Sequence, residues 1–365
     1  MKIKNITTYL EKIAPLSYQE NYDNSGLIVG NSSQEVTKIL LCLDSIESVI
    51  DEAIEKGCEL IIAHHPIVFK GLKKFNGKNY VEKVIIKAIK NNIAIYACHT
   101  NLDNILENGV NQKIAKKLGL TNQKILSQKT EILSKLAVFV PEKNAEEVRN
   151  SLFEAGAGNI GNYVNCSFNS EGNGTFKASK NANPHVGEIG KTHIEKEIKV
   201  EVIFPKYLKF NILEFLFKTH PYEEVAYDIH PLQNNNQEVG AGIIGELEQE
   251  MDSIEFLKLV KTKMKTNCVR HTDICKTTIK KVAICGGSGS FLLQNSIQQN
   301  ADIFITGDFK YHEFFDAENH LIIADIGHYE SEQFTIELFR EILETKFETI
   351  KFMETKINTN PINYL

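Results

Sequence analysis

ELIIAHHP, at positions 59–66, is the second of three short apolar runs in the first third of the chain. KILLCLD (38–44) precedes it and IAIYACHTNLD (93–103) follows it, and a segment with helical periodicity comes after each run. This alternation predicts parallel strands joined by right-handed helical crossovers. The pattern returns near the C-terminus in three further runs: KKVAICGGSG (280–289), ADIFITGD (301–308) and HLIIADIGH (320–328).

The middle of the chain has a different order. From Leu133 it reads strand, helix, strand, and the same order returns after a stretch rich in Gly, Asn and Ser at 169–191. We predict an irregular surface loop for 169–191 and a small ferredoxin-like α+β domain for the two repeats together.

The economical division is therefore an α/β core interrupted by an inserted domain. The core comprises residues 1–130 and 236–365, and the insert residues 131–235. We expect both chain ends to build one parallel-type sheet, because neither flank alone has many strands for a sheet covered on both faces. Three consecutive domains are the alternative.

Composition limits the class of protein. The 365 residues carry 41 Lys and Arg against 47 Asp and Glu, a formal net charge of −6, and 42% of them are hydrophobic. This mix excludes a disordered chain and gives little support to nucleic-acid binding. No window reaches the roughly 18 apolar residues of a membrane span, and no signal peptide is expected. Seven scattered cysteines without a CxxC pair favour free thiols and a cytoplasmic location.

Histidines and carboxylates gather where the predicted strands end. His64 and His65 follow one strand, Asp103 follows the next, and His328 and Glu332 follow a third. Ligands bind beyond the carboxyl ends of parallel strands, and a spacing of four places His328 and Glu332 on one helix face. Imidazole with carboxylate is a donor set that suits Zn, Fe or Mn.

Five such ligands exceed the needs of one open catalytic ion, so we predict two divalent metal ions per chain. Glu332 is the expected bridge, because a glutamate can give one oxygen to each ion. Paired ions sit about 3.5–4 Å apart and hold a water between them as a nucleophile. His99 competes with Asp103 as a ligand. His312 is expected to act as an acid or base, or to contact substrate, rather than to bind metal.

Three other features allow two interpretations each. GGSGS (286–290) could cradle an anion with its backbone amides or could form a tight turn. HPYEE (220–224) is expected to be a turn rather than a second metal site. Asp308 and Asp325 are expected to cap the turns or helices that follow them.

Several motifs together resemble the GTP cyclohydrolase I type 2 family, the Nif-three-like dinuclear-metal proteins. HHP followed by TNLD and GHYxSE is a specific combination, and the motifs lie in the family's order along nearly the whole chain. The stretches that carry the resemblance are YDNSGLIVG (22–30), IIAHHPIVF (61–69), ACHTNLDN (97–104), GDFKYHE (307–313) and DIGHYESE (325–332).

The resemblance implies a two-metal site with ligands at His64, His65, Asp103, His328 and Glu332. It also implies a homohexamer whose metal sites face an internal cavity, and an insert similar to the PII/CutA signalling fold.

If the family activity holds, the substrate is a nucleotide whose guanine imidazole ring is opened by water with release of formate. His312 or His99 could then shuttle a proton, and Lys310 with the 286–290 turn are the nearest candidates to hold a triphosphate. A phosphoesterase or amidohydrolase on the same centre is an alternative. A non-enzymatic, metal-dependent binding or regulatory protein is another.

Overall fold

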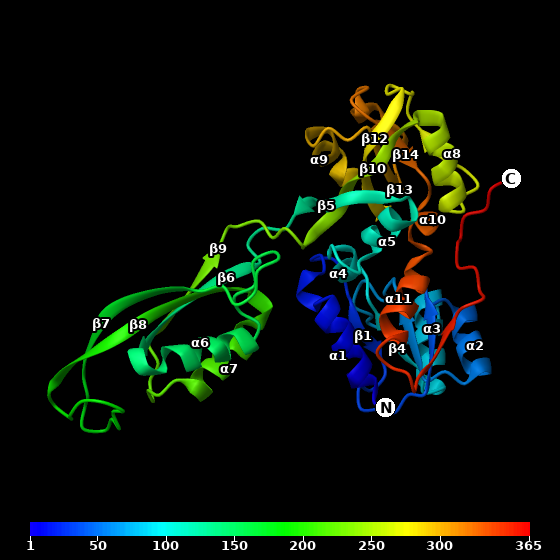
Figure 1. Cartoon of the computed structure of the whole chain (residues 1–365). Helices are drawn as coiled ribbons and strands as arrows, with labels where there is room; N and C mark the ends of the chain where they lie inside the picture. Colours follow the sequence, from blue (N-terminus) through cyan, green and yellow to red (C-terminus); the bar gives the residue numbers. More distant parts are fainter. The chain divides into compact units, whose positions relative to one another are not determined.

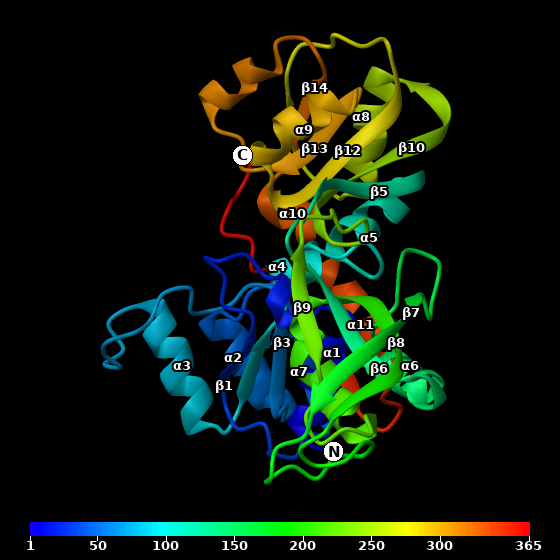
Figure 2. The same ribbon diagram turned by 90° about the vertical axis from the view of Figure 1, so that its left-hand side faces the viewer.

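The computed structural model describes residues 1–365 and divides into two compact units. The first unit comprises residues 1–128 and 238–365, and the second comprises residues 129–237. Figures 1 and 2 show the chain in two orientations, and each unit is described below by itself.

The first sheet of the larger unit has five strands in the order β1-β4-β3-β2-β15. β2, β3, β4 and β15 run parallel and β1 pairs antiparallel with β4. Helices α2 and α3 pack on one face through residues such as Val49 and Val84. The bounds are β1 Gly26–Val29, β2 Lys38–Cys42, β3 Leu60–Ala63, β4 Ala94–Ala97, β15 Lys351–Glu354, α1 Ile3–Ile13, α2 Glu47–Lys56, α3 Tyr80–Lys90 and α11 Thr335–Glu344.

The second sheet of the same unit has six strands in the order β11-β14-β13-β12-β10-β5. β12, β13 and β14 are parallel, whereas β5, β10 and β11 pair antiparallel with their neighbours. The bounds are β5 Leu120–Gln128, β10 Gly240–Asp252, β11 Arg270–His271, β12 Thr278–Ser288, β13 Ile303–Gly307, β14 Ile322–Asp325, α4 Thr100–Asp103, α5 Val110–Lys117, α8 Ser253–Lys263, α9 Leu293–Gln298 and α10 His328–Glu332.

The expectation of one parallel-type sheet is therefore wrong in one respect. The parallel runs form as predicted, but they build two mixed sheets, and each sheet takes one strand from the opposite flank: β15 joins the first and β5 joins the second. The reason is edge pairing: β15 hydrogen-bonds beside β2, and the long antiparallel β10 lies between β12 and β5. Hydrophobic runs do not specify which edges pair.

The smaller unit has a four-stranded antiparallel sheet in the order β7-β8-β6-β9. Its elements follow the predicted order β-α-β-β-α-β, and helices α6 and α7 cover one face through an apolar core. The bounds are β6 Leu133–Pro141, α6 Ala145–Glu154, β7 Phe168–Lys177, β8 Thr192–Pro205, α7 Lys209–Thr219 and β9 Tyr227–Leu232.

The prediction of a loop over residues 169–191 is wrong for its first part. Residues 168–177 form strand β7, which pairs with β8 from Phe168↔Glu201 to Lys177↔Thr192. Most β7 side chains are exposed and two residues are glycine, so the strand has no apolar alternation that a sequence pattern could reveal.

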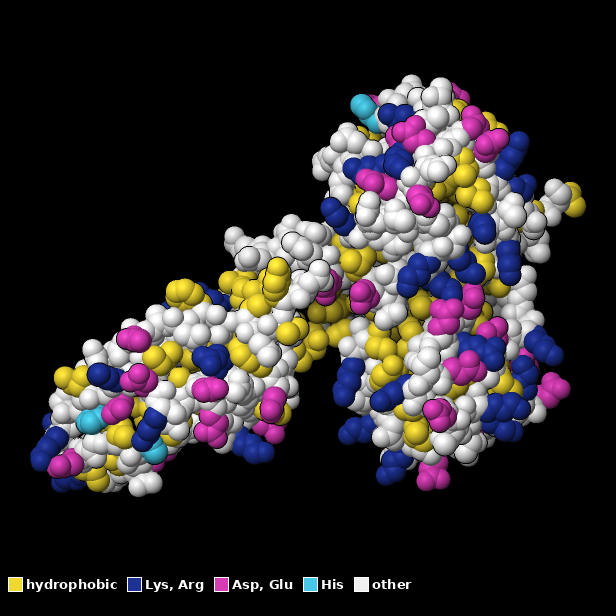
Figure 3. All heavy atoms as spheres, in the orientation of Figure 1, with side chains coloured by type: hydrophobic (Ala, Val, Ile, Leu, Met, Phe, Trp, Pro, Cys, Tyr) yellow, Lys and Arg dark blue, Asp and Glu magenta, His cyan; other side chains and the backbone are white.

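Two further properties bear on the class of protein. No helix is long and apolar enough to cross a bilayer, and all seven cysteines are free. On the face drawn in Figure 3, basic and acidic side chains are interspersed without a wide basic patch.

Candidate metal centre

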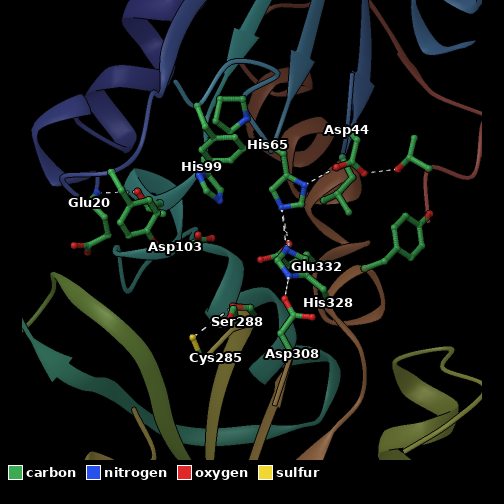
Figure 4. Close-up of a pocket in the computed structure, with 18 of the residues that line it drawn as sticks. Glu20, Asp44, His65, His99, Asp103, Cys285, Ser288, Asp308, His328 and Glu332 are labelled. Carbon is green, nitrogen blue, oxygen red and sulfur yellow. Dashed lines mark hydrogen bonds and ion pairs between the residues drawn. The ribbon is translucent and has the colours of Figure 1, made fainter. Parts of the chain in front are cut away.

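The two sheets of the larger unit bring the predicted ligands together. His64 and His65 follow β3, Asp103 ends the short helix α4 beyond β4, and α10, which holds His328 and Glu332, follows β14. Figure 4 shows His65, Asp103, His328 and Glu332 around one pocket, with a dashed line linking His65 to the residues of α10.

Glu332 is the centre of this cluster. Its Oε1 lies 3.6 Å from His64 Nε2, and its Oε2 lies 3.0 Å from His65 Nε2 and 3.1 Å from His328 Nε2. Asp103 Oδ1 lies 3.6 Å from His64 Nε2. The donor atoms of the predicted ligands thus gather in two groups, His64 with Asp103 and His65 with His328, and Glu332 presents one oxygen to each. A third group joins His64 and His65 to His99.

Two atoms of the cluster are buried without a partner. His64 Nε2 and Asp103 Oδ1 are inaccessible to solvent and form no hydrogen bond. Buried polar atoms are almost always satisfied, because leaving one unpaired costs about 1–3 kcal/mol. A cation between them would satisfy both, so the residues present fit a divalent metal ion.

Each histidine of the pocket is oriented through its Nδ1 atom. His64 donates to the carbonyl of Cys98 (2.9 Å) and His65 donates to Asp44 (2.7 Å). In the same way, His328 donates to Asp308 at 2.7 Å and His99 donates to Asp23 at 2.8 Å. Metal-binding histidines characteristically donate their second nitrogen to a carboxylate or a carbonyl. These contacts direct the Nε2 atoms of His64, His65 and His328 toward Glu332.

The pKa shifts describe a strongly coupled site. Burial raises the pKa of Asp103 to about 6. Burial acts in the same direction on Glu332, but His328 and His64 outweigh it and hold its pKa well below the usual range. Burial lowers the pKa of His65 and His328, but their carboxylate neighbours raise it to about 10 and about 11. Binding of a metal ion at these imidazoles would release any proton on the ligating nitrogens.

The glycine-rich segment 286–290, which could cradle an anion or form a tight turn, begins inside β12 and lies against Glu332. Gly286 N–H donates to Asn111 Oδ1 (2.8 Å) and Gly287 N–H donates to Ser331 Oγ (2.9 Å). A Cβ atom on Gly287 would overlap the carboxylate of Glu332. The turn is therefore glycine because α10 packs directly on it, and two of its amides are already occupied.

His312 is not brought to this site. It lies on the 3-10 helix η5 (Tyr311–Ala317), exposed, with its ring beside Tyr311 and Phe315. Lys310, the candidate for holding a triphosphate, is 85% exposed and does not line the pocket. Neither residue is among those that line the cavity of the cluster.

Of the two aspartates that were expected to act as caps, Asp308 and Asp325, only Asp325 does so. Asp325 accepts the Gly327 and Phe309 amides and pairs with Arg270, which agrees with a capping role. Asp308 instead orients His328, as Asp44 orients His65. Sequence reasoning missed both positioning roles, although Asp308 directly follows β13 and Asp44 lies two residues after β2.

HPYEE forms the predicted turn. His220 is buried, and both ring nitrogens bind backbone: Nε2 donates to the Phe139 carbonyl (3.0 Å) and Nδ1 accepts the Tyr222 amide (3.2 Å). No nitrogen remains for a metal ion.

The cluster opens into a cavity of about 700 Å³ within the larger unit. Aromatic rings line it, and its carboxylates are Glu20, Asp44, Asp103, Asp308 and Glu332. His99 also faces it, whereas no Lys or Arg does. The cavity therefore offers aromatic faces to a flat group, and any positive charge for an anion would have to come from bound metal ions rather than from Lys or Arg.

Comparisons with known proteins identify the family of the chain. The family model Duf34/NIF3 (NGG1p interacting factor 3) matches residues 1–361. The "GTP cyclohydrolase 1 type 2 homolog" of Bacillus subtilis (strain 168) is 39% identical over 99% of this chain and 98% of that protein. A homolog of the same name from Halalkalibacterium halodurans is 39% identical over the full length of both chains.

Solved structures give the same result. A Bacillus cereus protein related to NIF3 superposes with a TM-score of 0.86 at 36% identity, covering 100% of this chain and 99% of that one. A Staphylococcus aureus protein superposes with a TM-score of 0.79 at 32% identity over 100% and 99% of the two chains. The resemblance expected from the motifs is confirmed: the chain belongs to the DUF34/NIF3 family.

Proposed function

We propose that this chain is a hydrolase that uses two divalent transition-metal ions, Zn, Fe or Mn, held by His64, His65, Asp103, His328 and Glu332. The observation that carries the proposal is the position of Glu332, whose two oxygens face two separate donor groups. When bound, such a metal pair polarises a substrate oxygen and supplies a nucleophile at neutral pH.

The ligand set can be tested by elemental analysis after anaerobic reconstitution with each metal. We expect two ions per chain in the wild type, and less than one would refute the pair. Glu332→Ala should lose more metal than His99→Ala, because Glu332 belongs to both donor groups whereas His99 has no contact with Glu332 or Asp103 and lies beside His64 and His65 only. His99 is thus the control for a pocket histidine outside the predicted ligand set.

His99 is our candidate for moving a proton. Its Nδ1–H is fixed on Asp23, which leaves Nε2 as the atom that can exchange a proton in the cavity. In His99→Ala we expect intact metal content and a kcat lowered by about 10²–10⁴-fold. Loss of metal in this variant would make His99 a ligand.

The substrate is proposed from the lining of the cavity. The relatives' names point to GTP, but no lysine or arginine of this chain meets a triphosphate there. We infer that the reacting part is an aromatic heterocycle which stacks against rings such as Phe69, Tyr80 and Tyr329. Formate release from GTP, guanosine and guanine, measured in parallel, tests this: equal or faster turnover without phosphates is expected, and an absolute need for the triphosphate would contradict it.

Phosphoesters and amides belong in the same screen, because a phosphoesterase or amidohydrolase is the alternative use of this centre.

A non-enzymatic, metal-dependent binding protein is the second candidate. The separate cavity in the smaller unit favours it, because a regulatory protein needs a place to bind an effector. Tight ligand binding by the metal-loaded protein without turnover in any screen would move this candidate ahead of the hydrolase.

The remaining proposals concern assembly, location and domains. We propose a homohexamer, a cytoplasmic location supported by seven free thiols, and an inserted domain at 131–235 of PII/CutA type, supported by its strand order. Light scattering tests the assembly, and a mass near the 41.3 kDa of one chain across a range of concentrations would contradict it.

A further inference from the structure

The smaller unit contains a cavity of about 730 Å³ on the sheet face that its helices leave free. Val138 and Val200 point into the core beneath α6 and α7, so the alternate residues Phe139 and Lys199, which pair across β6 and β8, face the other side. Strand β7, residues 178–185 and the turn at 222–226 provide the remaining walls.

Glu197 is the buried polar group of this cavity. It is 9% exposed, and no lysine, arginine or histidine lies within ion-pair distance of it. Its Oε1 accepts the hydroxyl of Tyr222 at 3.0 Å. Its Oε2 lies where a Cβ on Gly174 would stand, so β7 needs glycine at this position to admit the carboxylate. A carboxylate that is buried without a counter-charge is costly unless a partner arrives.

Hydrogen bonds outside the cavity hold the turn that carries Tyr222, the partner of Glu197. Both ring nitrogens of His220 bind backbone, which locks the turn that holds Tyr222. Glu223 Oε1 accepts the amide of Asn183 at 2.8 Å, which ties this turn to the segment above β7. The hydroxyl of Tyr222 and the carboxylate of Glu197 are therefore held in place before any ligand binds, which lowers the entropy cost of binding.

Aromatic rings and negative charge complete the site. The Tyr222 ring lies 6.2 Å from that of Phe176 and 6.2 Å from that of His185, measured between centroids. The lining holds four glutamates and two lysines, a formal charge of −2, and Lys199 is already paired with Glu201 at 3.4 Å. Phosphates and other anions are disfavoured here.

The side chains of this cavity suit an organic cation better than a metal ion. All clusters of histidine, cysteine and carboxylate with metal-ligand spacing lie in the larger unit, and none includes Glu197. Aromatic faces attract ammonium and guanidinium groups, and a single carboxylate can accept their N–H donors. From the volume, the rings and the uncompensated Glu197 we infer that this cavity binds a small aromatic amine or amidine, with its cationic nitrogen on Glu197 and its ring beside Tyr222 and Phe176.

The experiment is isothermal titration of the full-length protein with benzylamine, and with benzyl alcohol and phenylacetate as neutral and anionic analogues of similar shape. We expect benzylamine to bind at least tenfold more tightly than either analogue. Equal binding of the three compounds, or no binding of benzylamine, would overturn the inference. This comparison uses the wild type alone, so it does not depend on the folding of a variant.

Two variants locate the site. Glu197→Gln keeps an oxygen for Tyr222 but removes the charge, and should weaken benzylamine binding by about tenfold or more. Glu171→Gln, at an exposed lining residue of β7, is the matched control and should change binding less than twofold. Unchanged affinity in Glu197→Gln would refute the site. Metal content should stay at the wild-type value in both variants, so the result is separate from that of the metal centre.

Discussion

Gly287 offers a direct test of how the metal centre is held. It lies at the end of β12 with φ +66°, and its amide binds Ser331, the neighbour of Glu332. A methyl group at this position would overlap the carboxylate of Glu332 and would lie 3.3 Å from Cε1 of His328. Gly287→Ala should therefore move the bridging carboxylate away from its donor groups.

Gly287→Ala should have two effects: a backbone cost to folding stability and a loss of metal affinity. Alanine at positive φ costs about 1–2 kcal/mol wherever it occurs. Gly119 has φ +74° with no atom within 4 Å of its Cβ position, so Gly119→Ala carries this backbone cost alone. Displacement of a group that orients or forms a metal site typically lowers metal affinity by about 10–100-fold. Only Gly287→Ala should show that second loss.

Two measurements distinguish the loss of folding stability from the loss of metal affinity. Thermal unfolding of the metal-free proteins should give midpoints lowered by about 2–8 °C in both variants. Competition with a chromophoric chelator should give wild-type metal affinity for Gly119→Ala and a 10–100-fold weaker affinity for Gly287→Ala. If Gly287→Ala binds metal as tightly as Gly119→Ala, then Glu332 is not held by this turn, and our account of the glycine is wrong.

The remaining predictions concern other parts of the chain. Asp44→Asn should weaken metal binding by about 10–100-fold, because His65 loses the carboxylate that orients it; an unchanged chelator competition curve would contradict this. His312→Ala should leave metal content and turnover at wild-type values, and a fall in kcat with full metal content would mean that another copy of the chain brings His312 to the site. Replacing residues 131–235 by a short Gly/Ser linker should leave a folded core with two ions, and insoluble or metal-free products at several linker lengths would refute the insertion. Metal at a hundred times its Kd should stabilise the protein by about 2.7 kcal/mol, so calorimetry with and without chelator should show a lower midpoint in the chelated sample.

Much of the site could be predicted because its residues carry their own signal. His64, His65 and His328 are polar residues that follow buried apolar strands. Residues in such positions meet at the carboxyl edge of a parallel sheet, so their place in the sequence predicts their place in the fold. Asp44 and Asp308 carry no such signal. Each lies 20 or more residues from the histidine it orients, and an aspartate after a strand is as compatible with capping a helix as with holding an imidazole.

The errors in the fold have a common physical cause. The sequence pattern reports which residues are buried, and it predicted the parallel strands and the β-α-β-β-α-β unit correctly. It does not report which backbone edges pair. Strand β15 beside β2 and strand β7 beside β8 are edge pairings. β7 has no buried residue and β15 has only Phe352 buried, so neither strand shows a regular apolar alternation in the sequence.

The core is divided into two sheets, and the candidate metal ligands come from both of them. His64, His65 and Asp103 follow strands of the first sheet, whereas His328 and Glu332 lie on a helix that follows a strand of the second. The His64–Asp103 group comes from the first sheet alone, whereas the His65–His328 group and the contacts of Glu332 need residues from both sheets. The contacts of His65 with Glu332 and of His64 with Glu332 therefore join the two sheets as well as defining a site. A ligand that binds only when both sheets are in place adds its binding free energy to their association. The same residues thus link the stability of the core to the occupancy of its chemical centre.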